Sequence, residues 1–140
     1  MWLLKVVSRP EFYRLCIRTE CLFMKSSEAD RQRVQHIREA INHIENFTEN
    51  VDYETYTSNL QLRLALVKLL EIIGEAASVL SDELRNEFSD IEWRTLKAVR
   101  NVLVHEYFGI NYEILWTSIQ HDIPILRERI DLLMASRFSE

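Results

Sequence analysis

Glycine and proline are scarce in this chain, which has only two residues of each among its 140. A β-sandwich or barrel needs many tight turns, and such turns draw heavily on glycine and proline. The chain is rich instead in residues that favour helices, above all Leu, Glu and Arg. Its length is sufficient for one sizeable hydrophobic core. We therefore predict a single all-α domain.

The charge and cysteine content exclude several classes of protein. A formal net charge of -5 argues against a general, charge-driven nucleic-acid binder, although it leaves room for a local basic cleft. Cys16 and Cys21 are the only cysteines, and they provide neither a metal-ligand spacing nor a disulfide framework. No run approaches the roughly 20 apolar residues of a membrane span. These features are typical of a cytoplasmic protein without a membrane partner.

The first 23 residues differ from the rest of the chain in charge. They contain four basic and two acidic residues and are therefore net +2, which leaves -7 for the remainder. Their apolar run is too short and too interrupted for a signal peptide. They form either an extra N-terminal helix or an addition from an upstream start, and we favour the second. The domain proper is then expected at residues 24–140.

Two long helical patterns fill the first half of that domain. The first begins at Ser27, which with Asp30 resembles a capping box, and ends near NFTEN. After an acidic linker, VDYETYT, Ser58 and Gln61 offer a second capping box for LQLRLALVKLLEIIGEAASVL. That stretch is apolar on nearly every face, which predicts burial on more than one side. We expect Gly74 within it to permit close approach of another backbone.

The second half contains two further long helical patterns. SDELRNEFSD predicts a short capped helical turn, after which Asp90 would cap a helix ending at Gly109 in a left-handed stop. Asn111 would cap the last helix, which Pro124 should kink or divide. Four main helices are most simply arranged as an antiparallel bundle.

The stretch RNVLVHEYFG, residues 100–109, carries polar side chains in an otherwise apolar helix. On a regular helix Arg100 and Tyr107 lie within roughly 20° of one face, whereas His105 points about 140° away from Arg100. One regular helix therefore cannot close both side chains around a small group. Either the helix loosens before Gly109, or a second copy of the chain contributes to the site across a two-fold axis.

The residue types at this stretch suit a phosphodiester. Arg100 offers a rigid, permanently charged fork for a phosphate. His105 can remove a proton from a ribose 2′-hydroxyl or donate one to the leaving oxygen. Asn101 could orient either group, and no metal or other cofactor is required. Spacing alone also allows Arg100 to be a surface ion-pair partner, His105 a helix-end residue and Tyr107 the edge of a core.

RNVLVHEY matches in full the R-x4-H-x-Y motif of the HepT-like toxins, a branch of the HEPN superfamily of small helical ribonucleases. The resemblance extends from HIREAINHIENFT through LEIIGEA and YFG to the W…DIP helix, and covers about residues 24–140. It implies a HEPN-like four-helix bundle that dimerises around the motif helix. It leaves residues 1–23 uncovered, which also favours Met24 as the natural start.

The resemblance further implies an activity and a regulator. Arg100 and His105 would form a metal-independent site that cleaves RNA, either tRNA or mRNA, in the cleft of a homodimer. Such toxins are usually encoded beside a minimal nucleotidyltransferase antitoxin, which attaches AMP to the motif tyrosine. Here that tyrosine would be Tyr107. AMP at this position would add negative charge and bulk where the RNA phosphate must lie.

Other side chains have weaker assignments. Arg94, Lys97 and Arg100 recur at three-residue spacing, and we expect this basic stripe to contact the RNA backbone. Tyr112 lies close enough to the motif to touch RNA, although Trp93, Tyr112 and Trp116 fit helix packing better. A further set is interpreted as ordinary polar surface: His36 and His43, which have no partner to complete a metal site, and Glu71 and Glu75 beside Gly74. The alternative for Glu71 and Glu75 is a carboxylate pair, one turn apart, that borders the dimer cleft.

An alternative function from another class stays open. The chain could be a non-catalytic helical partner whose cleft binds a nucleotide or a nucleotidyltransferase and regulates it. A purely structural bundle is the third interpretation, and it predicts no effect from replacing Arg100 or His105.

Overall fold

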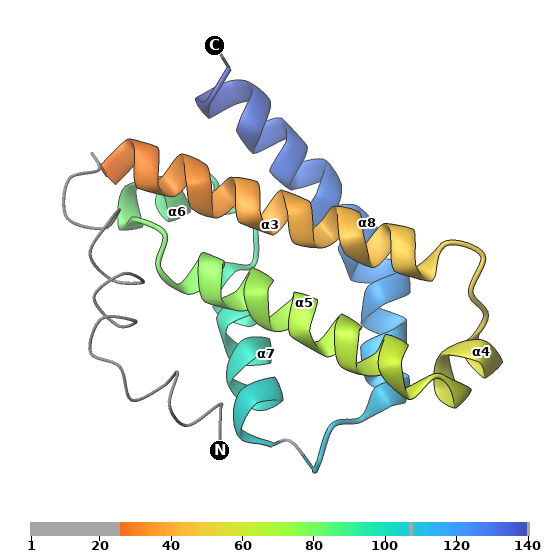
Figure 1. Ribbon diagram of the computed structural model, residues 1–140. Helices are drawn as coiled ribbons and strands as arrows, with labels where there is room; N and C mark the ends of the chain where they lie inside the picture. The colour runs from red at the N-terminus through yellow and green to blue at the C-terminus, as the bar shows by residue number, and fades with distance from the viewer. Residues whose placement is uncertain (1–25, 107, 140) are drawn as a thin grey trace, which may run out of the picture.

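The computed structural model describes residues 26–106 and 108–139 of the chain. Within these two ranges it contains six helices and no strand, which confirms the prediction of an all-α fold (Figure 1). The segment 1–23 and Tyr107, on which two of the predictions rest, lie outside the described ranges. The helices are α3 (Ser26–Thr48), α4 (Tyr53–Ser58), α5 (Leu60–Ser78), α6 (Asp82–Glu87), α7 (Trp93–His105) and α8 (Tyr112–Arg137).

Helix α5 lies between α3 and α7 in the bundle (Figure 1). This position explains why its sequence is apolar on nearly every face, because a helix packed on two sides has little surface left for polar residues. The core also includes the apolar face of α3, as its spacing predicted, and residues of α8. Fully buried residues of this core are Val34, Ile37, Ile41, Ile44, Tyr56, Leu66, Ala77, Ile130 and Leu133.

The expected capping box at the start of α3 is wrong. Ser27 lies inside the helix, and Asp30 is 3% exposed. The Asp30 carboxylate accepts hydrogen bonds from the backbone N–H of Ser81 at 3.1 Å and from the Ser81 hydroxyl, and it forms an ion pair with Arg33 at 3.2 Å. Asp30 therefore joins the start of α3 to the loop before α6, a contact between segments far apart in sequence.

The acidic stretch expected to be a linker forms the short helix α4. Asp52 caps this helix by accepting a hydrogen bond from the Thr55 N–H at 2.8 Å. Tyr56 is fully buried, stacks on Trp116 with ring centroids 4.6 Å apart, and donates a hydrogen bond to the Tyr112 carbonyl at 2.9 Å. Burial of this tyrosine thus stabilises a helix that local sequence barely signals.

The cap of α5 also differs from the expectation. Asn59, not Ser58, accepts the hydrogen bond from the Leu62 N–H at 3.0 Å. Ser58 is the last residue of α4, and its hydroxyl donates to the Glu54 carbonyl at 2.9 Å. Because Ser58 belongs to α4, its hydroxyl is not available to cap α5.

Helix α7 is shorter at both ends than expected. Asp90 does not cap it; the Asp90 carboxylate instead faces Arg129 on α8 at 3.9 Å, and no side chain of the described residues caps α7. The helix ends at His105, but it is regular from Arg100 to His105, so it does not loosen where that would bring the two side chains together. Gly109 has no positive φ and donates a hydrogen bond to the Glu106 carbonyl at 2.8 Å. The predicted left-handed stop is therefore wrong.

The predicted caps of α6 and α8 are confirmed. Ser81 accepts a hydrogen bond from the Leu84 N–H at 3.2 Å, and Asn111 accepts from the Glu113 and Ile114 N–H groups at 3.0 and 3.1 Å. Pro124 lies inside α8, which bends but is not divided (Figure 1). None of the described helices combines the length and the hydropathy that crossing a membrane requires.

Candidate functional site

Arg100 lies at a close contact between α7 and α5, where it packs against Gly74 of α5. A Cβ atom added to Gly74 would be 2.3 Å from the Cβ of Arg100 and 2.6 Å from the Leu96 carbonyl oxygen. Both distances are far below van der Waals contact, so this position accepts only glycine without a shift of the backbone. The expected role of Gly74 is confirmed, and its neighbour is the arginine of the motif.

Two groups fix the direction of the Arg100 guanidinium. Its Nη2 forms an ion pair with the Glu75 carboxylate at 2.8 Å, and its Nη1 donates a hydrogen bond to Asn101 Oδ1 at 2.9 Å. Asn101 is therefore in direct contact with the arginine that it was predicted to orient. Glu75, which we interpreted as ordinary polar surface, is in direct contact with it. The fork thus has a set direction before any ligand arrives.

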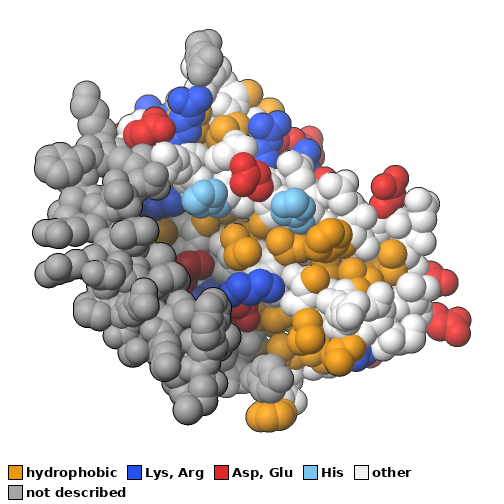
Figure 2. Space-filling view, in the orientation of Figure 1, with side chains coloured by type: hydrophobic (Ala, Val, Ile, Leu, Met, Phe, Trp, Pro, Cys, Tyr) orange, Lys and Arg blue, Asp and Glu red, His pale blue; other side chains and the backbone are white. Residues whose placement is uncertain are grey.

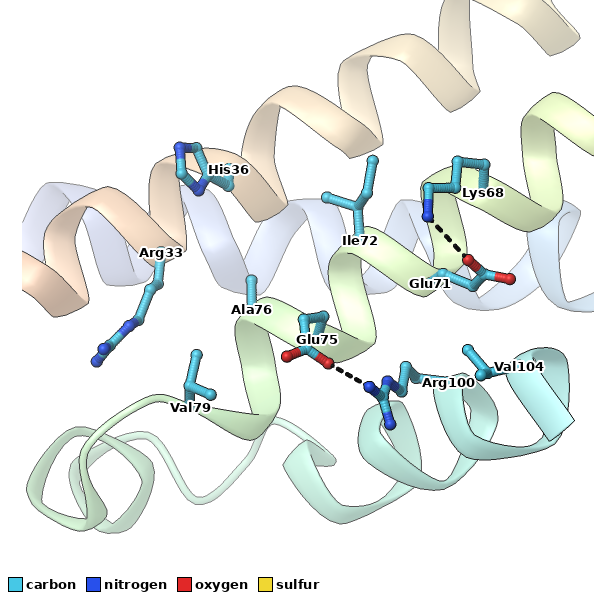
Figure 3. Close-up of a pocket in the computed structure, with 10 residues that line it drawn as sticks. All are labelled: Arg33, His36, Lys68, Glu71, Ile72, Glu75, Ala76, Val79, Arg100 and Val104. Carbon is cyan, nitrogen blue, oxygen red and sulfur yellow. Dashed lines mark hydrogen bonds and ion pairs between the residues drawn. The ribbon is translucent and has the colours of Figure 1, made fainter. Parts of the chain in front are cut away.

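A pocket of about 390 Å³ opens beside Arg100, between α3, α5 and α7 (Figure 3). Its volume falls within the range of small-ligand sites. Arg33 and His36 line it from α3, and Lys68 lines it from α5. Sequence reasoning missed all three residues, because nothing in the spacing along one helix shows what faces it from another. His36 in particular borders a cavity and is more than part of a solvated stripe.

His105 is the last residue of α7 and is exposed. The helix is regular from Trp93 to His105. Because His105 follows Arg100 by five residues, the two side chains point about 140° apart around the helix axis. His105 is accordingly not among the described residues that line the pocket. Within one chain, the two side chains therefore do not converge on one small group.

The remaining predicted residues lie in different surroundings. Arg94 and Lys97 are exposed on α7. Tyr112 is only half exposed at the start of α8, and the Arg63 guanidinium lies over its ring, 4.9 Å from the centroid. Packing is thus the role visible for Tyr112. Trp93 is buried and Trp116 stacks on Tyr56, so the packing role expected of both tryptophans is confirmed.

Apolar side chains are exposed around the motif. Val102 is 47% exposed and Phe108 is 99% exposed, while Val99 and Val104 are more than one-third exposed. Figure 2 shows hydrophobic side chains mixed with basic and histidine side chains on one face of the molecule. An apolar surface of this kind next to charged groups is typical of an interaction site.

Fold and site together define a small all-α domain with an arginine and a histidine presented on the exposed end of one helix. Residues 37–133 match the family described as Ribonuclease HepT-like. The chain belongs to this family, and the resemblance noted in the sequence is confirmed.

Individual relatives support the same assignment. The chain is 34% identical over 110 residues to "Probable ribonuclease HepT" of Thermococcus cleftensis, covering 79% of this chain and 98% of that protein. It is 34% identical over 97 residues to "Putative RNase MJ1380" of Methanocaldococcus jannaschii, covering 69% and 89%. No solved structure matches the chain.

Proposed function

We propose that this protein is a metal-independent endoribonuclease that acts as the toxin of a toxin–antitoxin pair in the cytoplasm. The observation that supports this function best is the directed guanidinium of Arg100 on an exposed helix that ends at His105. A ribonuclease without a metal needs one group to stabilise negative charge on phosphorus and another to move protons, and these two residues supply both.

In this mechanism the RNA supplies its own nucleophile. The ribose 2′-oxygen attacks the neighbouring phosphorus, a P–O2′ bond forms, and the bond to the 5′-oxygen of the next nucleotide breaks. His105 acts as general base toward the 2′-hydroxyl or as general acid toward the leaving 5′-oxygen. Arg100 binds the phosphate and stabilises the charge that develops on its oxygens, with Asn101 as its orienting neighbour.

A homodimer would complete the site. Arg100 and His105 diverge on one helix, so a two-fold axis beside α7 would bring the arginine of one protomer toward the histidine of its partner. The exposed apolar residues of α7, Val99 and Val102, supply a surface that such a dimer would bury. The basic residues Arg94 and Lys97 on the same helix would then contact the RNA backbone beside the cleft.

The proposed regulator is a minimal nucleotidyltransferase that transfers AMP to Tyr107. Membership of the family supports this partner, and Tyr107 follows His105 by two residues in the motif. AMP at Tyr107 would place a phosphate and a bulky base near the end of α7, where RNA must approach. Intact mass after co-expression with a neighbouring nucleotidyltransferase tests this, and an unmodified Tyr107 would contradict it.

Replacing His105 tests the catalytic function. His105→Ala should reduce RNA cleavage by about 10²–10⁴-fold, the usual contribution of a general acid or base, and should abolish growth inhibition. His121→Ala is the matched control, because His121 is an exposed histidine on α8 away from the motif. Sedimentation should show the same oligomer for both variants.

The alternative is a non-catalytic partner that binds a nucleotide or a nucleotidyltransferase. The pocket beside Arg100 favours it as a second candidate, because its volume suits a small ligand. Unchanged toxicity of the His105→Ala variant would exclude the enzyme and leave this regulatory function.

A further inference from the structure

The pocket between α3, α5 and α7 extends to one side of Arg100, which binds the cleaved phosphate in the proposed mechanism. Arg100 forms one of its walls, and His105 is not among the described residues that line it. An RNA whose scissile phosphate is bound by Arg100 would therefore place one flanking nucleotide against this pocket. This placement of the RNA rests on the proposed ribonuclease function.

The rim of the pocket carries three cations, each of which is paired with a carboxylate. Arg33, Lys68 and Arg100 are opposed within the pocket by Glu71 and Glu75, in a protein whose formal net charge is -5. Lys68 pairs with Glu71 at 3.1 Å, but its side chain is 70% exposed. Exposed pairs of this kind contribute little, so the ammonium can exchange its carboxylate for a phosphate.

Arg33 has a different partner and a different role. Its ion pair at 3.2 Å is with Asp30, whose carboxylate is buried and also accepts both hydrogen bonds from Ser81. A guanidinium has five N–H donors, and the contact with Asp30 runs through one nitrogen, Nη1. The ion pair with Asp30 thus holds Arg33 at the pocket and leaves other N–H donors of its guanidinium for a ligand.

The walls of the pocket are apolar between these cations. Ile72 and Val79 are 38% and 46% exposed, and Ala76 and Val104 complete this surface. An apolar wall within a cationic rim matches the two parts of a nucleotide, a flat base and a charged phosphate. His36 lies on the rim next to Arg33 on α3 and can donate a hydrogen bond to either part.

We propose that this pocket binds the nucleotide that flanks the scissile phosphate, with its base on the apolar wall. Arg33 and Lys68 lie at opposite ends of the pocket (Figure 3) and would each contact a different phosphate of the RNA backbone. A base can enter such a pocket only when it is unstacked and unpaired. The substrate class is therefore RNA that is single-stranded at the cleavage site, such as a loop or an unpaired end.

The test compares variants of the pocket with a matched surface variant. Arg33→Ala and Lys68→Ala remove pocket cations, whereas Arg38→Ala removes an arginine of α3 that pairs with Asp131 outside the pocket. Binding of a short single-stranded oligoribonucleotide is measured over a series of salt concentrations in the His105→Ala background. Cleavage of the same RNA is measured in otherwise wild-type protein, and circular dichroism checks folding.

Each pocket variant should weaken binding severalfold and reduce the slope of log affinity against log salt by about 0.7, the value for one single-strand phosphate contact. It should raise KM more than it lowers kcat. A wild-type preference for single-stranded over duplex RNA is also expected. Lys68→Ala keeps the test decisive if Arg33→Ala fails to fold, because Lys68 lies mostly in solvent.

Other results would overturn the proposal in distinguishable ways. If wild-type protein cleaves RNA and the pocket variants match Arg38→Ala, the subsite is wrong while the ribonuclease function stands. If the pocket variants change the oligomeric state and leave RNA affinity intact, a second copy of the chain occupies the pocket. If wild-type protein cleaves no RNA, the proposed function fails and the subsite fails with it.

Discussion

Gly74 on α5 lies directly against Arg100 on α7, so that a Cβ atom on the glycine would be 2.3 Å from the Cβ of the arginine. The next residue, Glu75, forms the ion pair with the same guanidinium at 2.8 Å. One turn of α5 therefore sets both the depth at which Arg100 lies and the direction in which it points. Four predictions follow from these and related contacts.

Gly74→Ala should force α5 and α7 apart. Overpacking a tight contact typically lowers the free energy of unfolding by about 1–3 kcal/mol, less the roughly 1 kcal/mol that alanine gains over glycine in a helix. Because Arg100 moves with α7, cleavage should fall further than stability alone predicts. Urea unfolding and RNA cleavage measure the two effects.

Gly109→Ala is the control for this change. A Cβ there would be 3.6 Å from the nearest atom and the residue has no positive φ, so stability should be retained. A Gly74→Ala protein that is more stable than wild type would contradict the close packing.

Glu75→Gln should tighten RNA binding. The amide can still accept a hydrogen bond from Arg100, but the negative charge that competes with phosphate for the guanidinium is removed. We expect a lower KM, most clearly at low salt where charges are least screened. Glu113→Gln, an exposed glutamate at the start of α8, is the control. A higher KM would show instead that the charge of Glu75 is needed to keep Arg100 in its active direction.

Asp30→Ala should destabilise the junction between α3 and α6. The change leaves the Ser81 N–H and the Arg33 guanidinium without the carboxylate that binds both. Loss of a buried hydrogen-bond partner costs about 1–3 kcal/mol, which denaturant unfolding can resolve. Asp122→Ala, at an exposed position of α8, should change stability little. Similar unfolding curves for both variants would rule out this role for Asp30.

Tyr56 should make the fold sensitive to high pH. Burial raises its pKa from 10.0 to about 12. The folded state thus holds the phenol proton more tightly than the unfolded state, so this contribution to stability is complete below pH 10 and is lost as the pH rises to 12. Unfolding measured from pH 8 upward should show this loss.

Tyr56→Phe should lower stability near neutral pH, because it removes the hydrogen bond to the Tyr112 carbonyl. It should also reduce the loss of stability between pH 10 and pH 12. Tyr53→Phe is the matched control, because Tyr53 is 45% exposed on the same helix. If the stability of Tyr56→Phe falls with rising pH as steeply as that of wild type, groups other than Tyr56 cause the loss.

Local sequence signals were most accurate where the interaction itself is local. The apolar spacing of α3 and the caps Ser81 and Asn111 all depend on neighbours within one or two turns. Asp30 and Ser58 show where local signals fail. Each has a residue type that suits a helix cap, but Asp30 binds Ser81 and Ser58 binds the Glu54 carbonyl instead. Tyr56 shows the converse, since tertiary burial helps to stabilise a helix that looked like a linker.

By itself the sequence determined the all-α class, the four long helices and the motif of Arg100, His105 and Tyr107, because periodicity and motif spacing are properties of one chain segment. Only the tertiary structure decided that Glu75 binds Arg100 and that Arg33, His36 and Lys68 share a pocket with it. These contacts join three helices, and their geometry depends on how closely the backbones approach. Gly74 sets that approach at Arg100, and its consequence is visible only once α5 and α7 are packed together.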